Sequence, residues 1–267
     1  MNASTRPPKN YHAEAVHLDE NRRGLRRSDV FLASFPRSGN TWMKLLLADV
    51  ILQRHGYQTD TQLPIDRNEI IPDIDKHRLK DFHPAVKLPF RLTKTHEHYE
   101  NISGKWSWRL RGPKVIYVFR DPADTLCSFY HFEKLREPGD NNAAIVGQIE
   151  PFCRSHVTEW RDHVESYVRG KRRAPKRILL VSYESLHEQA AEKLRAVALF
   201  LGLEATEAMC SRAEENHRFE KQRQVEDTRF FRRGLQGGSR DDLSAATIAF
   251  IEQECRATYD RARKLEA

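Results

Sequence analysis

The sequence predicts one α/β domain in which a central parallel β-sheet is flanked by helices and the first strand, loop and helix form a P-loop-like phosphate-binding unit. Three observations lead to this fold class. Short apolar runs alternate with amphipathic helical stretches, as expected for buried parallel strands and the helices that cover both faces. A glycine-containing turn joins the first apolar run to a helix, which is typical of phosphate-binding loops. At 267 residues the chain is long enough to bury a full core, and it contains no internal repeat.

The four expected strands share one signature, a short run of apolar and β-branched residues bounded by polar or turn residues. They lie at 29–36, 91–96, 114–119 and 177–182. The third has the strongest β character, and the Asp121-Pro122 pair that follows it is a helix-start signal. Ligands of such sheets bind at the carboxyl ends of the strands, so the residues that follow each strand are the candidates for a site.

Amphipathic periodicity predicts the helices between and after these strands. They are expected at 41–55, 123–132, 145–169, 186–201, 206–216 and 243–265. Residues 56–90 predict irregular structure with one helix at most, and residues 219–241, rich in Arg, Gln and Gly, predict a loop. The polar, arginine-rich residues 1–28 are expected to be a loosely held arm that precedes a domain formed by residues 29–267.

The composition favours a soluble protein with an anionic partner. Hydrophobic residues make up 39% and charged residues 31% of the chain, and no apolar stretch approaches the roughly 20 residues that cross a bilayer. The N-terminus lacks the apolar core of a signal peptide, so we expect a cytoplasmic protein without a membrane span. The net charge of +7 fits either nucleic acid or a small polyphosphorylated ligand, and composition alone leaves both open.

The four cysteines predict neither a disulfide framework nor a zinc site. They are widely separated, they form no CxxC pair, and we find no histidine near them at ligand spacing. Reduced thiols in a cytoplasmic compartment are therefore expected.

The segment Ser34–Trp42, with the sequence SFPRSGNTW, has the chemistry of a phosphate-binding loop. Gly39 permits a tight turn, and the amides of residues 38–41 would lie at a helix N-terminus, where the helix dipole favours an anion. Arg37 adds a forked cation and Thr41 a hydroxyl. The first glycine and the lysine of the GxxxxGK[ST] nucleotide loop are absent. Taken alone, the segment is equally consistent with an ordinary strand-to-helix turn.

A second candidate follows the third expected strand. Arg120 ends that strand, and a helix that leans back over the sheet would turn Ser128 toward the same point. Arginine binds phosphate through planar, bidentate contacts. Taken alone, this pattern is better explained by an Arg–Asp pair at the surface and an incidental helix serine.

Three motifs, in the same order along the chain, resemble those of the cytosolic sulfotransferase family. They are FPRSGNTW at 35–42, VIYVFRDPADTLCSFYHF at 115–132 and FFRRGLQGG at 230–238. Trp160, His163 and the segments 183–186 and 217–221 are weaker echoes, and the resemblance covers roughly residues 29–260.

The resemblance implies an enzyme that takes a sulfuryl group from 3′-phosphoadenosine-5′-phosphosulfate (PAPS), releases the bisphosphate PAP and requires no metal. It implies that the first motif binds the 5′-phosphosulfate, that Arg120 and Ser128 hold the 3′-phosphate, and that the third motif closes over that phosphate. Trp42 and Phe219 would enclose the adenine, and Tyr183 would hydrogen-bond it. The implied donor-binding residues are Arg37, Ser38, Gly39, Asn40, Thr41, Trp42, Arg120, Ser128, Tyr183, Phe219, Phe231, Arg232, Arg233 and Gly234.

The second expected strand ends in Lys94-Thr95-His96, which matches the family's catalytic Lys-Thr-His. A hydroxyl must lose its proton as its oxygen bonds to sulfur, and a neutral imidazole suits that task, so His96 is expected to be the general base. Lys94 and Arg37 are expected to neutralise the charge on the leaving oxygen in an in-line displacement with a loose transition state. His98, two residues further along, is the nearest rival for the base.

The chain departs from the family pattern at three places. Arg37 stands where many members have Lys, and an arginine, which stays charged, is a poor proton donor to the leaving phosphate. Residues 237–239 read Gly-Gly-Ser where the family often has Gly-Asp-Trp. Residues 240–249 lack the Lys…Thr-Val…Glu pattern that some relatives use to dimerise, so we do not expect that dimer.

Two other classes of function remain as alternatives. A nucleotide-dependent kinase is disfavoured by the missing Walker lysine and by the lack of an evident carboxylate pair for magnesium. A non-catalytic protein that binds phosphonucleotides or nucleic acid is favoured by the charge, but it leaves Lys94 and His96 unexplained. The acceptor, expected to be a hydroxyl of a small molecule, a glycoside or a lipid, has no signature in the sequence.

Overall fold

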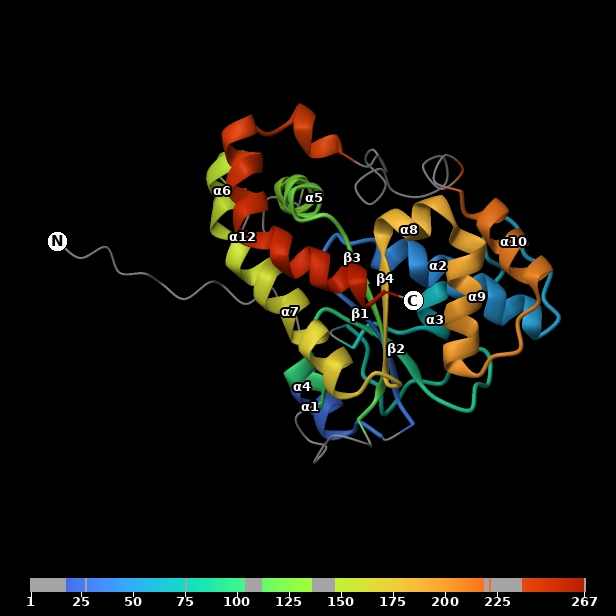
Figure 1. Cartoon of the computed structure of the whole chain (residues 1–267). Coiled ribbons are helices and arrows are strands. Elements are labelled where there is room, and N and C mark those ends of the chain that lie inside the picture. The colour runs from blue at the N-terminus through green and yellow to red at the C-terminus, as the bar shows by residue number, and fades with distance from the viewer. Residues whose placement is uncertain are drawn as a thin grey trace.

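Four parallel strands form the sheet at the centre of the computed structural model, which describes residues 18–26, 28–74, 76–103, 112–135, 147–218, 221 and 237–266 (Figure 1). The strands are β1 (Val30–Ser34), β2 (Leu92–Thr95), β3 (Lys114–Phe119) and β4 (Ile178–Ser182). Their order across the sheet is β2-β1-β3-β4, and each neighbouring pair is parallel. The predicted fold class and all four predicted strands are confirmed.

The register of the strands brings their carboxyl ends to one edge of the sheet. Ala33 of β1 lies opposite Thr95 of β2, and Ser34 lies opposite Val118 of β3. The segments that leave these strands therefore start at the same edge, where parallel sheets bind their ligands.

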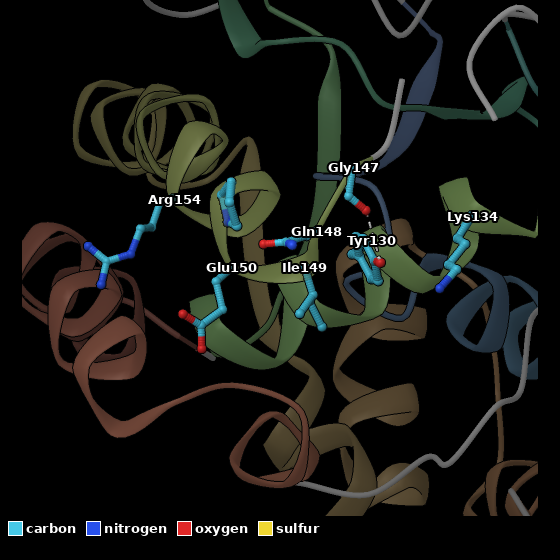
Figure 2. Close-up of a pocket in the computed structure, with 8 residues that line it drawn as sticks. Tyr130, Lys134, Gly147, Gln148, Ile149, Glu150 and Arg154 are labelled. Atoms are coloured by element: carbon cyan, nitrogen blue, oxygen red, sulfur yellow. Dashed lines mark hydrogen bonds between the residues drawn. The ribbon is translucent and has the colours of Figure 1, made fainter. Parts of the chain in front are cut away.

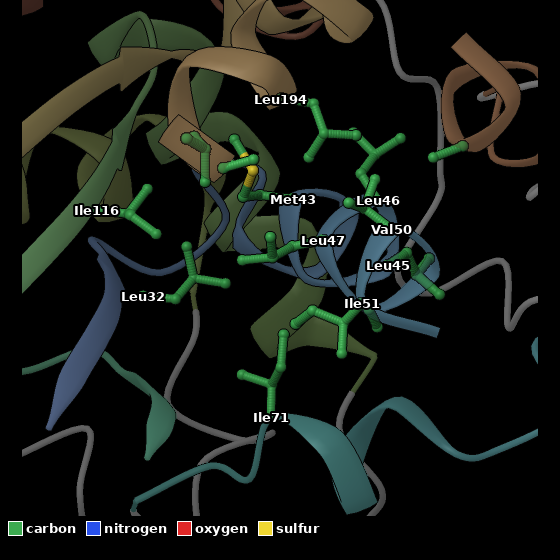
Figure 3. Close-up of a cluster of buried hydrophobic side chains, with 14 of the residues drawn as sticks. Leu32, Met43, Leu45, Leu46, Leu47, Val50, Ile51, Ile71, Ile116 and Leu194 are labelled. Carbon is green, nitrogen blue, oxygen red and sulfur yellow. The ribbon is translucent and has the colours of Figure 1, made fainter. Parts of the chain in front are cut away.

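One face of the sheet is covered by the helix that follows β1 and by the helices that follow β4. This group contains α2 (Asn40–Arg54), α3 (Arg67–Ile70), α8 (Tyr183–Glu188), α9 (Ala190–Leu201) and α10 (Glu207–Asn216). Leu32 and Ile116 of the sheet and Met43, Leu47 and Leu194 of the helices belong to one buried apolar cluster (Figure 3). Burial of an aliphatic side chain of this size contributes about 1.5–3 kcal/mol, so the cluster fixes α2 and the loop before it against the sheet.

The opposite face is covered by a second group of helices (Figure 1). This group contains α4 (Tyr99–Ser103), α5 (Pro122–Lys134), α6 (Ile149–Ser155), α7 (Val157–Arg173) and α12 (Ala245–Lys264). Phe31 and Tyr117 point to this side while their strand neighbours point to the other, as the period of two along a strand requires. Within the described ranges, no helix has the length and apolar character needed to cross a membrane.

Two predicted helices are divided, and two short helices within the domain of residues 29–267 were not predicted. The segment 145–169 contains α6 and α7, which meet at His156, and the segment 186–201 contains part of α8 and all of α9. Gln189, between α8 and α9, has φ −144°, outside the helical range. Neither break falls at a glycine or a proline, so the sequence carries no local signal that would divide the predicted helix. Helix α4 and the short 3₁₀ helix η1 (Gly238–Asp241) lie in segments for which we expected no helix.

Part of the expected N-terminal arm is bound to the domain. Helix α1 (Leu18–Arg23) carries Asn21, which is buried and whose side-chain nitrogen donates hydrogen bonds of 2.7 Å to the carbonyl oxygens of Ile74 and His77. The backbone amide of Leu79 donates to the Asn21 side-chain oxygen over 2.8 Å. The expectation of a loosely held arm is therefore wrong for α1, and residues 1–17 lie outside the described residues.

Candidate active site

The loop between β1 and α2 has the backbone of an anion-binding turn. Gly39 precedes α2 with φ +98°, and Arg37 has φ +66°, which is unfavourable for a residue that carries a Cβ. Helix α2 has no acidic residue in its first turn and no side-chain cap. The Ser38 hydroxyl is buried and has no hydrogen-bond partner among the residues that the structure describes. A strained turn with a buried, unsatisfied hydroxyl at a helix N-terminus fits a loop that binds a phosphate or sulfate group.

The first two residues of α2 differ in what they offer a ligand. The Asn40 side chain is buried and donates to the Ser34 hydroxyl oxygen over 3.0 Å, so it fastens the start of the helix to β1. Thr41 is partly exposed. The side-chain nitrogen of Asn40 is therefore occupied within the protein, whereas its buried side-chain oxygen has no partner among the described residues.

A close approach between two chain segments explains why residue 39 is glycine. A Cβ atom on Gly39 would lie 2.5 Å from Cδ2 of Tyr183, closer than real Cβ atoms come to other heavy atoms. Tyr183 starts α8 directly after β4, and its ring centroid lies 5.9 Å from that of Trp42 in an edge-to-face arrangement. The structure thus brings Gly39, Trp42 and Tyr183 together, and their contacts with a donor stay a prediction.

The two predicted phosphate-binding motifs meet at Arg37 and Ser128. Nε of Arg37 lies 3.4 Å from Oγ of Ser128, and its guanidinium carbon lies 4.8 Å from the ring centroid of Phe132. These residues come from the loop after β1 and from α5 after β3, 91 positions apart in the chain. Both are partly exposed, so a ligand can reach them. The two motifs therefore form one site.

Arg120 joins this site through the ring of Tyr183. Its guanidinium carbon lies 4.4 Å from the Tyr183 ring centroid, and its Nη2 lies 3.5 Å from Oδ2 of Asp124. The side chains of Arg120 and Asp124 are 11% and 3% exposed, so this is not the surface pair that we weighed as an alternative. Asp124 also accepts hydrogen bonds from the backbone amides of Gly237 (2.7 Å) and Ser239 (3.0 Å). It therefore connects Arg120 to the end of the predicted glycine loop.

Tyr183 and Trp42, the two described aromatic residues that were expected to contact the adenine, are both buried. Burial raises the pKa of the Tyr183 hydroxyl, an effect that the charge of Arg120 opposes. Trp42 is buried, and its Nε1 donates to the carbonyl oxygen of His217 over 2.7 Å. Five predicted site residues lie outside the described residues: Phe219, Phe231, Arg232, Arg233 and Gly234.

His96 follows β2, and its ring is oriented by the end of β1. Its Nδ1 lies 2.8 Å from the carbonyl oxygen of Ser34 and 3.4 Å from the Ser34 hydroxyl. A carbonyl oxygen only accepts hydrogen bonds, so the shorter contact assigns the proton of the neutral ring to Nδ1 and the lone pair to Nε2. Because Ser34 also begins the loop that carries Arg37, the basic nitrogen is fixed relative to that loop.

Two buried side chains that we had not assigned to the site hold the backbone at His96. Nε2 of His163, on α7, lies 3.0 Å from the His96 carbonyl oxygen, and Nδ1 of the same ring lies 2.8 Å from the Tyr117 hydroxyl. The ring therefore donates to the carbonyl and accepts from the tyrosine. Burial raises the pKa of Tyr117 well above its usual value, although a hydrogen bond from the Phe35 backbone opposes this. A chain of hydrogen bonds thus runs from Phe35 in the phosphate loop to His96.

Lys94 is paired with an acidic residue from the segment 56–90. The Nζ atom of Lys94 lies 2.6 Å from Oδ2 of Asp73, and the sequence did not predict this ion pair. Lys44 of α2 lies close by, and its Nζ donates to the side-chain oxygen of Asn68 over 2.6 Å. Burial, and next the charge of Lys94, lower the pKa of Lys44 to about 7. These residues form a partly buried polar cluster on the side of the sheet that α2 covers.

A cavity of about 630 Å³ lies beside the end of α5 and the start of α6 (Figure 2). Tyr130, Lys134, Arg154 and residues 147–151 line it, and the Tyr130 hydroxyl donates to the carbonyl oxygen of Gly147 over 3.2 Å. None of the predicted site residues lines this cavity, so the candidate site is the loop edge of the sheet and not the cavity.

The cysteines require a correction. Cys127 and His131 stand four residues apart on α5, and one potential ligand atom from each lies within 4.8 Å of the other and of a carboxylate oxygen of Asp242. The expectation that no histidine stands at ligand spacing from a cysteine is therefore wrong. The four cysteines themselves are buried and form no disulfide.

The fold is an α/β fold with a parallel sheet, and the loop at the carboxyl edge of that sheet is suited to a phosphate or sulfate group. The sulfotransferase domain family matches residues 27–263 of the chain. The chain is 30% identical to cytosolic sulfotransferase 13 of Arabidopsis thaliana, over 90% of this chain and 79% of that protein. It is 26% identical to flavonol 3-sulfotransferase of Flaveria bidentis, over 85% of this chain and 80% of that protein.

Solved structures share the fold. The mouse sulfotransferase SULT7A1, complexed with PAP, has a TM-score of 0.67 at 20% identity and covers 93% of this chain and 92% of its own. A putative steroid sulphotransferase of Arabidopsis thaliana has a TM-score of 0.64 at 20% identity, over 94% of this chain and 83% of its own. The chain belongs to the sulfotransferase family and is a sulfotransferase, as its three motifs predicted.

Proposed function

We propose that this sulfotransferase takes its sulfuryl group from PAPS and transfers it to a hydroxyl of a small molecule, a glycoside or a lipid. The observation that carries the proposal is the 3.4 Å contact between Arg37 and Ser128, because it joins the loop suited to a 5′-phosphosulfate with the helix suited to a 3′-phosphate. A ligand with two phosphate groups on one nucleoside fits this pair of motifs. The PAP complex of the mouse sulfotransferase that shares the fold supports the same donor.

The donor would be held by three groups of residues. Arg37, the Ser38 hydroxyl and the amides at the start of α2 are suited to the 5′-phosphosulfate, because they combine a cation, an unsatisfied donor and a helix N-terminus. Arg120 and Ser128 are suited to the 3′-phosphate. Trp42 and Tyr183 would contact the adenine, and Phe219 and the arginines of the glycine loop remain proposed partners on the basis of the family motif.

His96 would act as the general base through Nε2. As the acceptor oxygen bonds to sulfur, Nε2 takes the hydroxyl proton, the bond between sulfur and the phosphate oxygen breaks, and PAP leaves with the electron pair. Arg37 would stabilise the leaving oxygen by its charge alone. Lys94 remains a second proposed cation, and we propose that Asp73, 2.6 Å from its Nζ, directs its ammonium group. No step in this scheme needs a metal ion.

His163 and Tyr117 are proposed positioning residues. Their hydrogen bonds fix the carbonyl of His96 and reach the amide of Phe35, so they hold the base and the phosphate loop in one geometry. We also infer a cytoplasmic location, which the relatives named cytosolic sulfotransferases support, and we propose neither the family dimer nor a nucleic-acid partner.

Heat denaturation with added ligands tests the donor. A ligand present at about 100 times its dissociation constant stabilises a protein by about 2.7 kcal/mol, which corresponds to about 5–10 °C for a domain of this size. We expect PAP to raise the midpoint by this amount, and we expect ATP, AMP and duplex DNA to have little effect. AMP is the matched control, because it lacks only the 3′-phosphate assigned to Arg120 and Ser128.

Stabilisation by ATP with magnesium, and none by PAP, would favour the kinase alternative. Stabilisation by DNA alone would favour the non-catalytic alternative. Once PAP binding is established, a screen of acceptor pools with labelled PAPS, analysed by mass spectrometry of the products, identifies the acceptor class.

A further inference from the structure

A cluster of potential metal ligands lies on α5 outside the proposed donor site. We propose that Cys127, His131 and Asp242 bind a zinc ion that holds the segment around η1 to α5. Oδ2 of Asp242 lies 3.3 Å from Sγ of Cys127 and 3.3 Å from Nε2 of His131, and the three ligand atoms all lie within 4.8 Å of one another. Nothing in the proposed transfer reaction uses these three side chains.

The spacing of the ligands follows from the helix. Side chains four residues apart on an α-helix lie one above the other on the same face, so Cys127 and His131 point to one place. Asp242 directly follows η1 and reaches that place from 111 positions further along the chain than His131. One ligand pair on a helix and a third ligand from a distant segment is a common way to build a metal site.

The distances agree with tetrahedral zinc. Bonds of about 2.3 Å to sulfur and about 2.1 Å to nitrogen or oxygen, at a tetrahedral angle, place neighbouring ligand atoms about 3.4–3.6 Å apart. The two 3.3 Å distances lie close to this value, and the ligand atoms of the third pair, which lie within 4.8 Å of each other, would close to about 3.6 Å. A thiolate, an imidazole and a carboxylate together favour zinc over calcium or magnesium, which prefer oxygen ligands alone.

The surroundings allow the metal to enter and to be retained. Cys127 is buried, whereas the side chains of His131 and Asp242 are 26% and 18% exposed, so the cluster has a protein side and a solvent side. On binding, the Cys127 thiol would release its proton to solvent, the neutral imidazole would bind through Nε2, and water would complete the fourth position.

The ion would strengthen a contact between α5 and the segment around η1 that two hydrogen bonds already make. Asp124, one turn before Cys127 on α5, accepts hydrogen bonds from the amides of Gly237 and Ser239. Without a metal, the same cluster is a pair of hydrogen bonds in which Cys127 and His131 donate to Asp242. The two descriptions differ in a measurable property, because only the first yields a metal–thiolate bond.

Cobalt substitution tests the proposal. The full-length protein, prepared without a polyhistidine tag and treated with a chelator, is titrated with Co²⁺ and then with Zn²⁺. We expect one equivalent of Co²⁺ to produce a thiolate-to-cobalt charge-transfer band and the intense visible absorption of tetrahedral cobalt, and one equivalent of Zn²⁺ to abolish both. Zn²⁺ should also raise the midpoint of heat denaturation, because it binds the folded chain.

Two variants and a matched control test whether Cys127 and His131 are ligands of the metal ion. Cys127→Ser should abolish the charge-transfer band, and His131→Gln should weaken Zn²⁺ binding by at least about tenfold, the smallest loss typical of a removed partner around a metal site. Cys210→Ser removes an equally buried thiol on the opposite face of the sheet and should leave the band unchanged. Absence of the band in the unaltered chain, or its persistence in Cys127→Ser, would overturn the proposal; the test does not depend on PAPS, so its result is independent of the donor assignment.

Discussion

Replacement of His96 by alanine is expected to lower kcat by about 10²–10⁴-fold while the dissociation constant of PAP changes by less than about twofold. This range is the usual contribution of a general base. The base acts on the acceptor hydroxyl, and the donor contacts come from other residues, so binding of the donor should survive. The measurements are steady-state turnover with labelled PAPS and calorimetric titration with PAP.

A series of phenol acceptors of graded acidity separates base catalysis from a structural effect. An acidic phenol ionises without help, whereas a weakly acidic one needs the base, so the loss in His96→Ala should grow as the acceptor becomes less acidic. His98→Ala is the control, because His98 lies two residues away and its ring packs 4.7 Å from His163 between centroids. If His98→Ala shows the graded loss and His96→Ala does not, the assignment of the base is wrong.

Replacement of Gly39 by alanine is expected to lower the free energy of unfolding by about 2–5 kcal/mol and to weaken PAP binding by about tenfold or more. The left-handed backbone at φ +98° costs an alanine about 1–2 kcal/mol. The added Cβ would lie 2.5 Å from the buried Tyr183 ring, and relief of such overpacking costs about 1–3 kcal/mol. The displaced loop would then misalign Arg37 and the helix amides with the donor. Urea denaturation and PAP titration measure the two effects.

Gly56→Ala is the matched control for that variant. Gly56 has φ +82°, also in the left-handed region, but nothing lies within 4 Å of the position that a Cβ would occupy. It should therefore show only the backbone cost, and the difference between the two variants measures the contact with Tyr183. Equal losses of stability in both variants would show that the approach of the loop to Tyr183 has no energetic consequence.

The sequence predicted the sheet well because each strand carries a local signal. The run VFLAS before the Gly39 turn and the run KVIYVF before Asp121-Pro122 are apolar, β-branched and sharply bounded. The breaks at His156 and Gln189 were not predicted because no glycine or proline marks them.

Most of the site could be predicted only through the family resemblance. Arg37 and Ser128 are 91 positions apart, and their contact depends on β1 and β3 being neighbours in the sheet, which no local pattern reveals. The pairing of Asp73 with Lys94 depends on the path of an irregular segment. The spacing of Cys127 and His131 was present in the sequence and was overlooked, whereas the approach of Asp242 depends on how the segment around η1 packs against α5.

Calorimetric titration of PAP into the unaltered chain and into Arg120→Ala and Ser128→Ala tests the central claim most directly. One PAP should bind per chain, and each variant should bind about 10- to 100-fold more weakly, because a hydrogen bond to a charged group contributes about 1.5–3 kcal/mol. Arg161→Ala, which removes an arginine paired with Glu254 and outside the site, should bind as the unaltered chain does. Undiminished PAP affinity in both Arg120→Ala and Ser128→Ala would contradict the claim that these residues and the Arg37 loop form one site for a single bisphosphorylated nucleoside.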